Sequence, residues 1–150
     1  MNPNILPTQR TAVVGAIDPD ALSTGTYTTG WVSMADWNAV LATVMAGALG
    51  TSATLDAKIE GATDGSGTDA QDLDGKAISQ LTQAGDDDSD SQALINVRAD
   101  DLSDGYTHVR LSLTVGTATS DAGALLQGFD PRHHPVATGD DATSVVEIVD

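Results

Sequence analysis

The chain of 150 residues contains no cysteine. Disulfide bonds, thiolate zinc sites and a cysteine nucleophile are therefore excluded. A protein without cysteine is compatible with both reducing and oxidising compartments. The composition for this reason does not indicate the redox environment.

Long apolar runs are also absent. The longest, residues 40–49, is about half of the ~18–20 apolar residues that a membrane-spanning helix requires. The first ten residues, MNPNILPTQR, lack the basic start and the apolar core of a secretory signal. We therefore expect a soluble, unprocessed protein without a membrane partner.

Basic residues are scarce, with 6 Lys and Arg against 22 Asp and Glu, which gives a net charge of −16. Proteins that bind nucleic acid usually carry a basic patch, so nucleic acid is not an expected partner. An acidic surface would suit strong salt, where ions screen self-repulsion over about 3 Å at 1 M. A surface that is merely well solvated explains the same charge and is the simpler interpretation.

Glutamate is almost missing among the acids, because Glu60 and Glu147 are the only two. Glutamate favours helix interiors, whereas aspartate favours caps and turns because its side chain bonds to nearby backbone. An aspartate-, threonine- and glycine-rich chain that is poor in lysine therefore predicts strands joined by turns.

Alternating and β-branched segments predict seven to nine short strands. The predicted strands are residues 11–17, 26–32, 53–62, 76–82, 92–99, 106–115 and 121–129. We expect the first to stop at Asp18-Pro19-Asp20 and the last at Asp130-Pro131, because proline cannot donate to a ladder. A turn is expected at Asp104-Gly105.

Residues 37–49 fit either an amphipathic helix or a strand that is buried on both faces. We favour the strand, because Gly47 and Gly50 would weaken a short helix, and we expect it to form a hairpin with residues 53–62. Ser33–Asp36 has the outline of a capping box, which predicts a single helical turn before Trp37.

The fold class that follows is mainly β: a single-domain antiparallel β-sandwich or jelly-roll-like barrel with minor helix. One domain suits this length. We expect an N-terminal arm at residues 1–10, a β domain at residues 11–136, and a C-terminal segment at residues 137–150. Within that segment, residues 144–149 are expected to form an edge strand or an arm.

Two acidic loops are expected at residues 64–75 and 85–91. They contain spaced aspartates, namely Asp69, Asp72 and Asp74 in one and Asp86, Asp88 and Asp90 in the other. The second run begins like an EF-hand loop, but Ser91 replaces the required glycine and Val97 replaces the bidentate glutamate. A weak calcium site and a solvated loop both fit. We favour the solvated loop and assign no metal site.

Catalytic signatures are weak. The three histidines are His108, His133 and His134, and His108 is expected on the solvated face of a strand. Adjacent histidines point apart in an extended chain, so the pair would offer at most one ligand to a site shared between subunits. No G-x-S-x-G occurs, and neither the glycine-rich residues 61–67 nor Gly75-Lys76 continues as a phosphate-binding loop. We therefore expect no enzyme, no catalytic residue and no cofactor.

Aromatic residues are few, and we expect them to be core anchors. They are Tyr27, Trp31, Trp37, Tyr106 and Phe129. Any of them that proves exposed would be a candidate for an interface hot spot.

Four stretches carry a resemblance to a known group of proteins. They are residues 30–50 (GWVSMADW with VLA and AGALG), 53–68 (ATLDAKIE with ATD and GT), 76–82 (KAI with QLT) and 108–136 (HVR, Ala122, PR and PV). In pattern and order they resemble small structural proteins encoded among the head genes of tailed bacteriophages, prophages and gene transfer agents. The resemblance covers roughly residues 27–136.

The resemblance implies a β-rich protein on the surface of the virion head, made in the bacterial host cytoplasm. It would be a capsid cement or decoration subunit, a vertex turret, or the base of a head spike. The implied partners are the major capsid protein, copies of the chain itself in a trimer or pentamer, and at a vertex a head fibre protein. The aspartate content departs from the wider group and suggests a host in a salty habitat.

Two alternatives remain open at this point. One is a tail component, such as a tube or terminator ring, which would be present in far fewer copies per particle than a head decoration. The other is a calcium-dependent binding module, which the spaced aspartates would serve.

Overall fold

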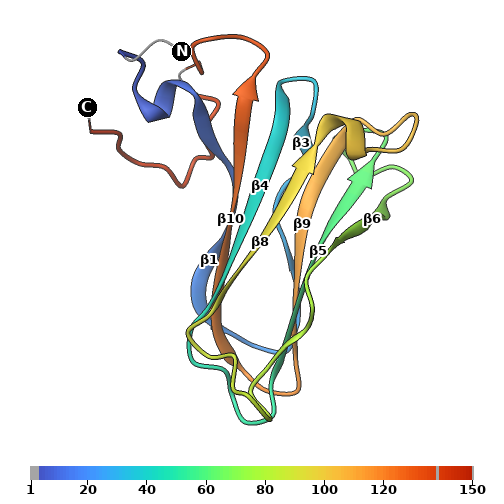
Figure 1. The fold of residues 1–150 in the computed structure, drawn as a ribbon, viewed down its shortest axis with the longest axis vertical. Helices are drawn as coiled ribbons and strands as arrows, with labels where there is room; N and C mark the ends of the chain where they lie inside the picture. The colour runs from blue at the N-terminus through green and yellow to red at the C-terminus, as the bar shows by residue number, and fades with distance from the viewer. Residues whose placement is uncertain (1–3, 138, 150) are drawn as a thin grey trace.

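The protein is a sandwich of two antiparallel sheets, described here from a computed structural model for residues 4–137 and 139–149 (Figure 1). The four-stranded sheet contains, in spatial order, β1 (Thr11–Leu22), β10 (Ser120–Pro131), β4 (Trp37–Ala46) and β8 (Gln92–Arg98). The six-stranded sheet contains β2 (Gly25–Thr28), β9 (His108–Gly116), β5 (Thr54–Ala62) and β6 (Gln71–Ala77), with β3 (Val32–Ser33) on β9 and β7 (Leu81–Thr82) on β5. The predicted mainly β sandwich with minor helix is confirmed.

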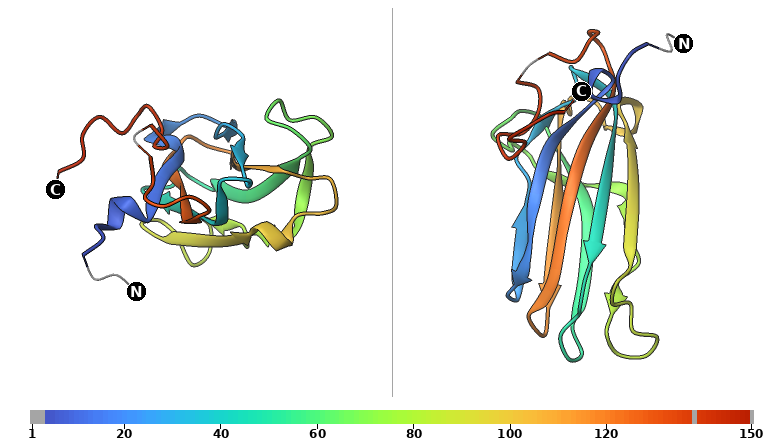
Figure 2. Two further views of the ribbon diagram at one scale, coloured as in Figure 1. Left: turned by 90° about the horizontal axis from the view of Figure 1, so that it is seen from above. Right: turned by 90° about the vertical axis from the view of Figure 1, so that its left-hand side faces the viewer.

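The strand order is that of a jelly roll. When the two-residue strands β3 and β7 are set aside, every connection except β5–β6 carries the chain from one sheet to the other. Eight strands wound in this way form two interlocking Greek keys. Figure 2 shows that the sheets remain two layers, so the molecule is a sandwich and not a closed barrel.

Helix is limited to two short 3₁₀ segments, η1 (Pro7–Gln9) and η2 (Ala99–Asp101). No helix among the described residues has the length and apolar character to cross a membrane. The N-terminal arm predicted at residues 1–10 lies partly outside the described residues, and η1 lies within the described part, residues 4–10.

The strand predicted over residues 37–49 exists as β4, but the expected β4–β5 hairpin is wrong. The two strands belong to opposite sheets, and β4 pairs with β10 and β8 instead. The backbone after β4 is held by β10, since the Gly47 amide donates to the Asp121 carbonyl at 2.7 Å and the Asp121 amide donates to the Ala48 carbonyl at 2.9 Å. This long-range pairing directs the chain across the sandwich.

Strand β1 does not stop at Asp18-Pro19-Asp20 as expected. Its pairing with β10 shifts between Ile17 and Asp20, so Pro19 lies in a bulge and the strand continues to Leu22. Because β1 is an edge strand, a residue without an amide proton costs no ladder hydrogen bond on its open side. Strand β10 ends at Pro131, within the predicted stop at Asp130-Pro131.

Two other segments before β4 differ from the predictions. Residues 26–32 are split into β2 and β3. Between them, the Thr29 amide donates to the Leu111 carbonyl and the Thr29 hydroxyl accepts from the Leu111 amide, so a side chain takes the place of the backbone in this pairing. Ser33–Asp36 forms a hydrogen-bonded turn instead of a helical turn, with the Ser33 hydroxyl accepting from the Ala35 amide at 3.2 Å. The single turn is too short for a helix to propagate.

The strand predicted over residues 76–82 is also replaced by two strands. The second half of the expected acidic loop, from Gln71, pairs with β5 as β6, and a separate β7 follows at Leu81–Thr82. Leu73 is buried in β6, which explains why this aspartate-rich segment adopts a strand. Residues 144–149 form no strand, so of the two predicted alternatives, an edge strand or an arm, the edge strand is wrong; we call this segment the C-terminal tail.

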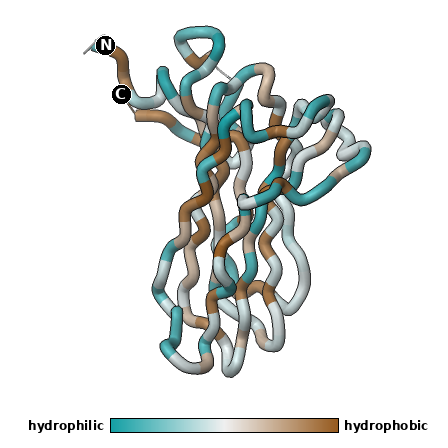
Figure 3. The backbone as a smooth tube through the Cα atoms, turned by 45° about the vertical axis from the view of Figure 1, so that its right-hand side comes forward, coloured by the Kyte–Doolittle hydropathy of each residue, from teal (hydrophilic) through white to brown (hydrophobic). Residues whose placement is uncertain are grey.

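The core lies between the two sheets. Its largest fully buried side chains are Leu55, Ile59, Leu111, Leu113 and Leu126. They occupy alternate positions of β5, β9 and β10, as the period-two patterns predict. Figure 3 shows hydrophobic residues along the strands and hydrophilic residues in many of the loops.

Aromatic residues contribute less to this core than expected. Trp37 is buried, and its ring lies over Gly128, where any side chain would collide with it. Tyr27 is partly buried and packs against the core, as predicted. Trp31, Tyr106 and Phe129 are also only partly buried but lie outside the core cluster, so the prediction of core anchors is wrong for these three. Aliphatic and alanine side chains make up most of the interior.

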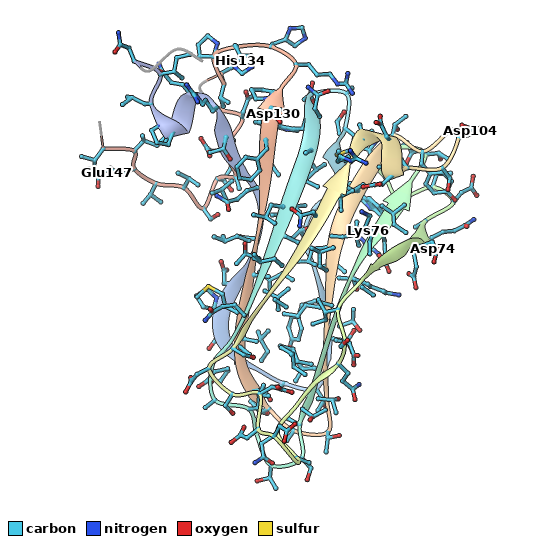
Figure 4. The ribbon with its side chains drawn as sticks, in the orientation of Figure 1. Asp74, Lys76, Asp104, Asp130, His134 and Glu147 are labelled. Carbon is cyan, nitrogen blue, oxygen red and sulfur yellow. The ribbon has the colours of Figure 1, made fainter. Side chains whose placement is uncertain are left out.

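Lys76 joins the sheets at one side of the sandwich, next to β8 (Figure 4). Its ammonium group pairs with the Asp101 carboxylate at 2.8 Å and donates to the Asn96 carbonyl at 2.9 Å. The hydrogen bond from Lys76 and then that from the Arg98 amide lower the pKa of Asp101 below its ordinary value. The side where β6 and β8 meet is thus closed by a charge-assisted contact.

Leu111→Ala should lower the free energy of unfolding by about 2–5 kcal/mol, because it removes a fully buried side chain and leaves a cavity. Leu94→Ala, a truncation on the outside, should change it by less than about 0.5 kcal/mol. Urea denaturation measures both. Equal effects would contradict the position of the core.

Asp101→Asn should lower the free energy of unfolding at neutral pH by about 0.5–1 kcal/mol. Because the folded-state pKa of Asp101 is lowered, its stabilisation is complete above the ordinary value of 3.8 and is lost as the pH falls through the folded-state pKa. The difference between the two proteins should therefore shrink below pH 3.8. Asp104→Asn, in an exposed turn, is the matched control, and a difference that does not depend on pH would refute this role.

Candidate interaction face

The middle of the outer face of the four-stranded sheet carries no charge across three neighbouring strands. We define the uncharged face by the residues that alternate with buried positions on β10, β4 and β8, without Asp121 and Arg98, which share this face at its margins. These are Leu125, Gln127 and Phe129 of β10; Ala39, Leu41, Thr43 and Met45 of β4; and Gln92, Leu94 and Asn96 of β8. The first charged neighbours, Asp121, Asp130 and Arg98, lie at the strand ends.

Strand register aligns these side chains in rows across the sheet. Leu125 lies opposite Thr43, which lies opposite Leu94, and the adjacent row places Met45 beside Gln92. Leu125, Met45 and Leu94 are 37%, 50% and 60% exposed. Large apolar side chains gathered in this way differ from single exposed leucines, which are common on any surface.

The outer face of the six-stranded sheet is different, because opposite charges pair across β5, β6 and β9. Lys58 contacts Asp72 at 2.7 Å and Glu60 at 3.6 Å, and Arg110 Nε donates to Glu60 at 2.7 Å. The hydrogen bond to Asp72 is the main reason why the pKa of Lys58 is raised. Paired charges therefore cover this face, as is typical of a solvated surface.

Trp31 lies over the charged face instead of in the core. The Arg110 guanidinium stacks on its ring at 4.5 Å from the centroid, a cation–π contact. Gly67 also approaches the indole, so closely that a Cβ there would be 2.6 Å from Nε1. Since the ring already has partners of its own chain, Trp31 serves to hold the 63–68 loop against β9.

A groove of about 740 Å³ borders the uncharged face where β1 bulges at Pro19. Most of its lining is apolar and includes Ala16, Ile17, Pro19, Met45, Gly123 and Leu125. Three aspartates also line it, Asp18, Asp20 and Asp121, together with Ser144 of the C-terminal segment. The groove therefore lies between the uncharged face and the open edge of the sheet, and it carries carboxylates that the uncharged face lacks.

The spaced aspartates do not converge on a common point. Asp88 accepts a hydrogen bond from the Thr82 amide at 2.8 Å, whereas Asp86 and Asp90 are exposed. In the other run, Asp72 pairs with Lys58 and Asp74 projects from β6 (Figure 4). Within residues 4–137 and 139–149, no three histidine or acidic side chains are grouped as metal ligands would be.

The histidines have no arrangement typical of catalysis. His108, at the start of β9, exchanges a hydrogen bond of 2.8 Å with the Thr107 hydroxyl. His133 and His134 lie exposed in the bend after β10, at the end of the sandwich that also carries the C-terminal segment (Figures 1 and 4). The structure thus places these residues in separate segments.

Sequence reasoning did not identify the uncharged face or the groove. The separate position of Leu94 was visible in the alternation of residues 92–99, and the lack of charge in residues 37–49 was a second signal. Their meaning depends on which strands are neighbours, and the strand order came only with the structure.

No protein-family model matches the sequence, and neither does any curated protein. Among solved structures, the chain is similar to one in the structure of infectious bursal disease virus Gt strain, with a TM-score of 0.42 and 12% identity over 89% of this chain and 36% of that one. A chain in the cryo-EM structure of Broad Bean Stain Virus gives a TM-score of 0.45 and 10% identity over 92% of this chain and 94% of that one. A chain in the structure of infectious bursal disease virus Gx strain gives a TM-score of 0.43 and 15% identity over 93% of this chain and 41% of that one.

Proposed function

We propose that this chain is a structural protein of a virus particle, mounted on the head of a tailed bacteriophage as a cement, decoration, turret or spike-base subunit. It would work without catalysis, by packing against copies of itself and against the major capsid protein. The observation that carries this proposal is the uncharged face, which lies on a chain of net charge −16.

A broad, partly apolar face costs free energy when it is left in water. Burial of apolar surface is worth roughly 25 cal/mol per Å², and charged groups at an interface core must be desolvated or paired. A chain that keeps its carboxylates away from one broad, partly apolar sheet face lowers the cost of covering that face. The core of a protein interface is depleted of charge in the same way.

Two further features support the same function. The jelly-roll strand order is one that virus particle proteins use, although lectins and cupins share it. The resemblance of residues 27–136 to head proteins of tailed phages indicates the same class independently of the fold. Neither the aspartate loops nor the histidines form a site that would favour a calcium module or an enzyme among the described residues.

Leu94→Asp combined with Leu125→Asp should abolish assembly, because two buried charges would lack partners in the covered face. Ala77→Asp is the matched control, since Ala77 is exposed on β6 opposite Lys58 and faces outward on the other sheet. Native mass spectrometry of the isolated chain and incorporation into particles during infection measure the outcome.

The expected result is a folded double variant that remains monomeric and is lost from particles, beside a control that assembles normally. Circular dichroism verifies that both variants fold. A double variant that assembles as the wild type does would refute the role of the uncharged face. Few copies per particle, located at the tail, would instead identify a tail component.

A further inference from the structure

The C-terminal tail, residues 144–149, is apolar yet unburied. Val146, Ile148 and Val149 are 93%, 50% and 84% exposed, and the sequence SVVEIV contains a single charge at Glu147. Side chains of this kind gain free energy by leaving water, so an exposed apolar segment marks a contact that the isolated chain does not make. The tail is comparable in length to a β-strand.

The groove beside β1 offers a surface of matching chemistry. Its lining is mainly apolar, and Ser144, the first residue of the tail, already lies in it. The preceding segment is attached to the same edge strand, since the Ala142 amide donates to the Val13 carbonyl and the Val13 amide donates to the Asp141 carboxylate at 2.8 Å. Beyond this point the described tail makes no such bond to β1.

Beyond Ser144 the tail does not line the groove of its own chain. A turn with a 2.9 Å hydrogen bond from the Val145 amide to the Ala142 carbonyl directs the chain outward. Figure 4 shows Glu147 projecting away from β1 and from the body of the sandwich. A tail that leaves its own domain at this point is positioned for a neighbouring molecule.

We propose that the tail of one copy lies in the β1 groove of a second copy and adds to the open edge of its four-stranded sheet. The inference rests on the proposed function, because it requires that the chain assembles with itself. Addition of a strand to an open edge satisfies backbone groups, and apolar side chains such as Val146 would fill the groove. Exchanged tails would link subunits next to the uncharged face.

Charge makes this contact sensitive to salt. Asp18, Asp20 and Asp121 line the groove and Glu147 lies in the tail, so like charges approach one another on docking. Salt screens this repulsion and strengthens apolar association, so docking should tighten as the salt concentration rises. A contact held by ion pairs would respond in the opposite direction.

Mixed cross-linking tests the proposal cleanly because the chain has no cysteine of its own. Val146→Cys in one preparation is mixed with isotopically labelled Met45→Cys, whose cysteine lies in the groove, and oxidised. Disulfide-linked pairs of mixed label should form several-fold faster than with Ala77→Cys as the second partner, and faster in 1 M than in 0.1 M NaCl. Mass spectrometry distinguishes the pairs.

Equal yields with Met45→Cys and Ala77→Cys would overturn tail exchange. So would a double variant, Val146→Cys with Met45→Cys, that closes its disulfide within one chain at high dilution as fast as in concentrated solution. A chain that ends at Thr143 completes the test, since it should self-associate several-fold more weakly while its melting temperature is unchanged.

The two proposals fail in different ways. If the chain ending at Thr143 associates as strongly as the full chain while Leu94→Asp with Leu125→Asp does not associate, tail exchange is wrong and the uncharged face stands. A full chain that stays monomeric at all concentrations and never joins a particle overturns both.

Discussion

The side chains of Leu55, Leu111 and Leu126 lie fully buried between two sheets, and the other features depend on the packing of those two inner faces. It holds together strands that are distant in sequence, such as β1 and β10, and so creates the jelly-roll order. The Lys76–Asp101 contact closes one side of this sandwich. At the other side, β1 remains an open edge with a bulge and a groove.

Once the inner faces are committed to each other, charge can be placed only at the loops and on the two outer faces. The chain uses these surfaces unequally. Ion pairs around Glu60 cover the six-stranded sheet, and the aspartate loops take up much of the remaining charge, while the uncharged face is left free of both signs. An asymmetry of this kind gives the subunit a solvated side and a side suited to packing against protein.

The sequence was sufficient for the β class, for the strands β4, β5, β8, β9 and β10, and for the inward residues of β9, because alternation reports burial directly. It was insufficient to predict that β4 and β5 belong to opposite sheets. Local turn residues do not reveal that the Gly47 amide bonds to Asp121 of β10. It also misplaced Trp31, since cation–π stacking on Arg110 depends on strand neighbours. The uncharged face needed the same long-range information.

Oxidation of Met45 by dilute peroxide, compared between the free chain and intact particles, shows whether the uncharged face is covered by protein on assembly. Met45 lies half exposed on the uncharged face, and the buried Met34 is an internal reference. If the face is covered on assembly, Met45 should oxidise readily in the free chain and at least about tenfold more slowly in the particle, which corresponds to protection by about 1.4 kcal/mol. Equal rates in both states would contradict the account.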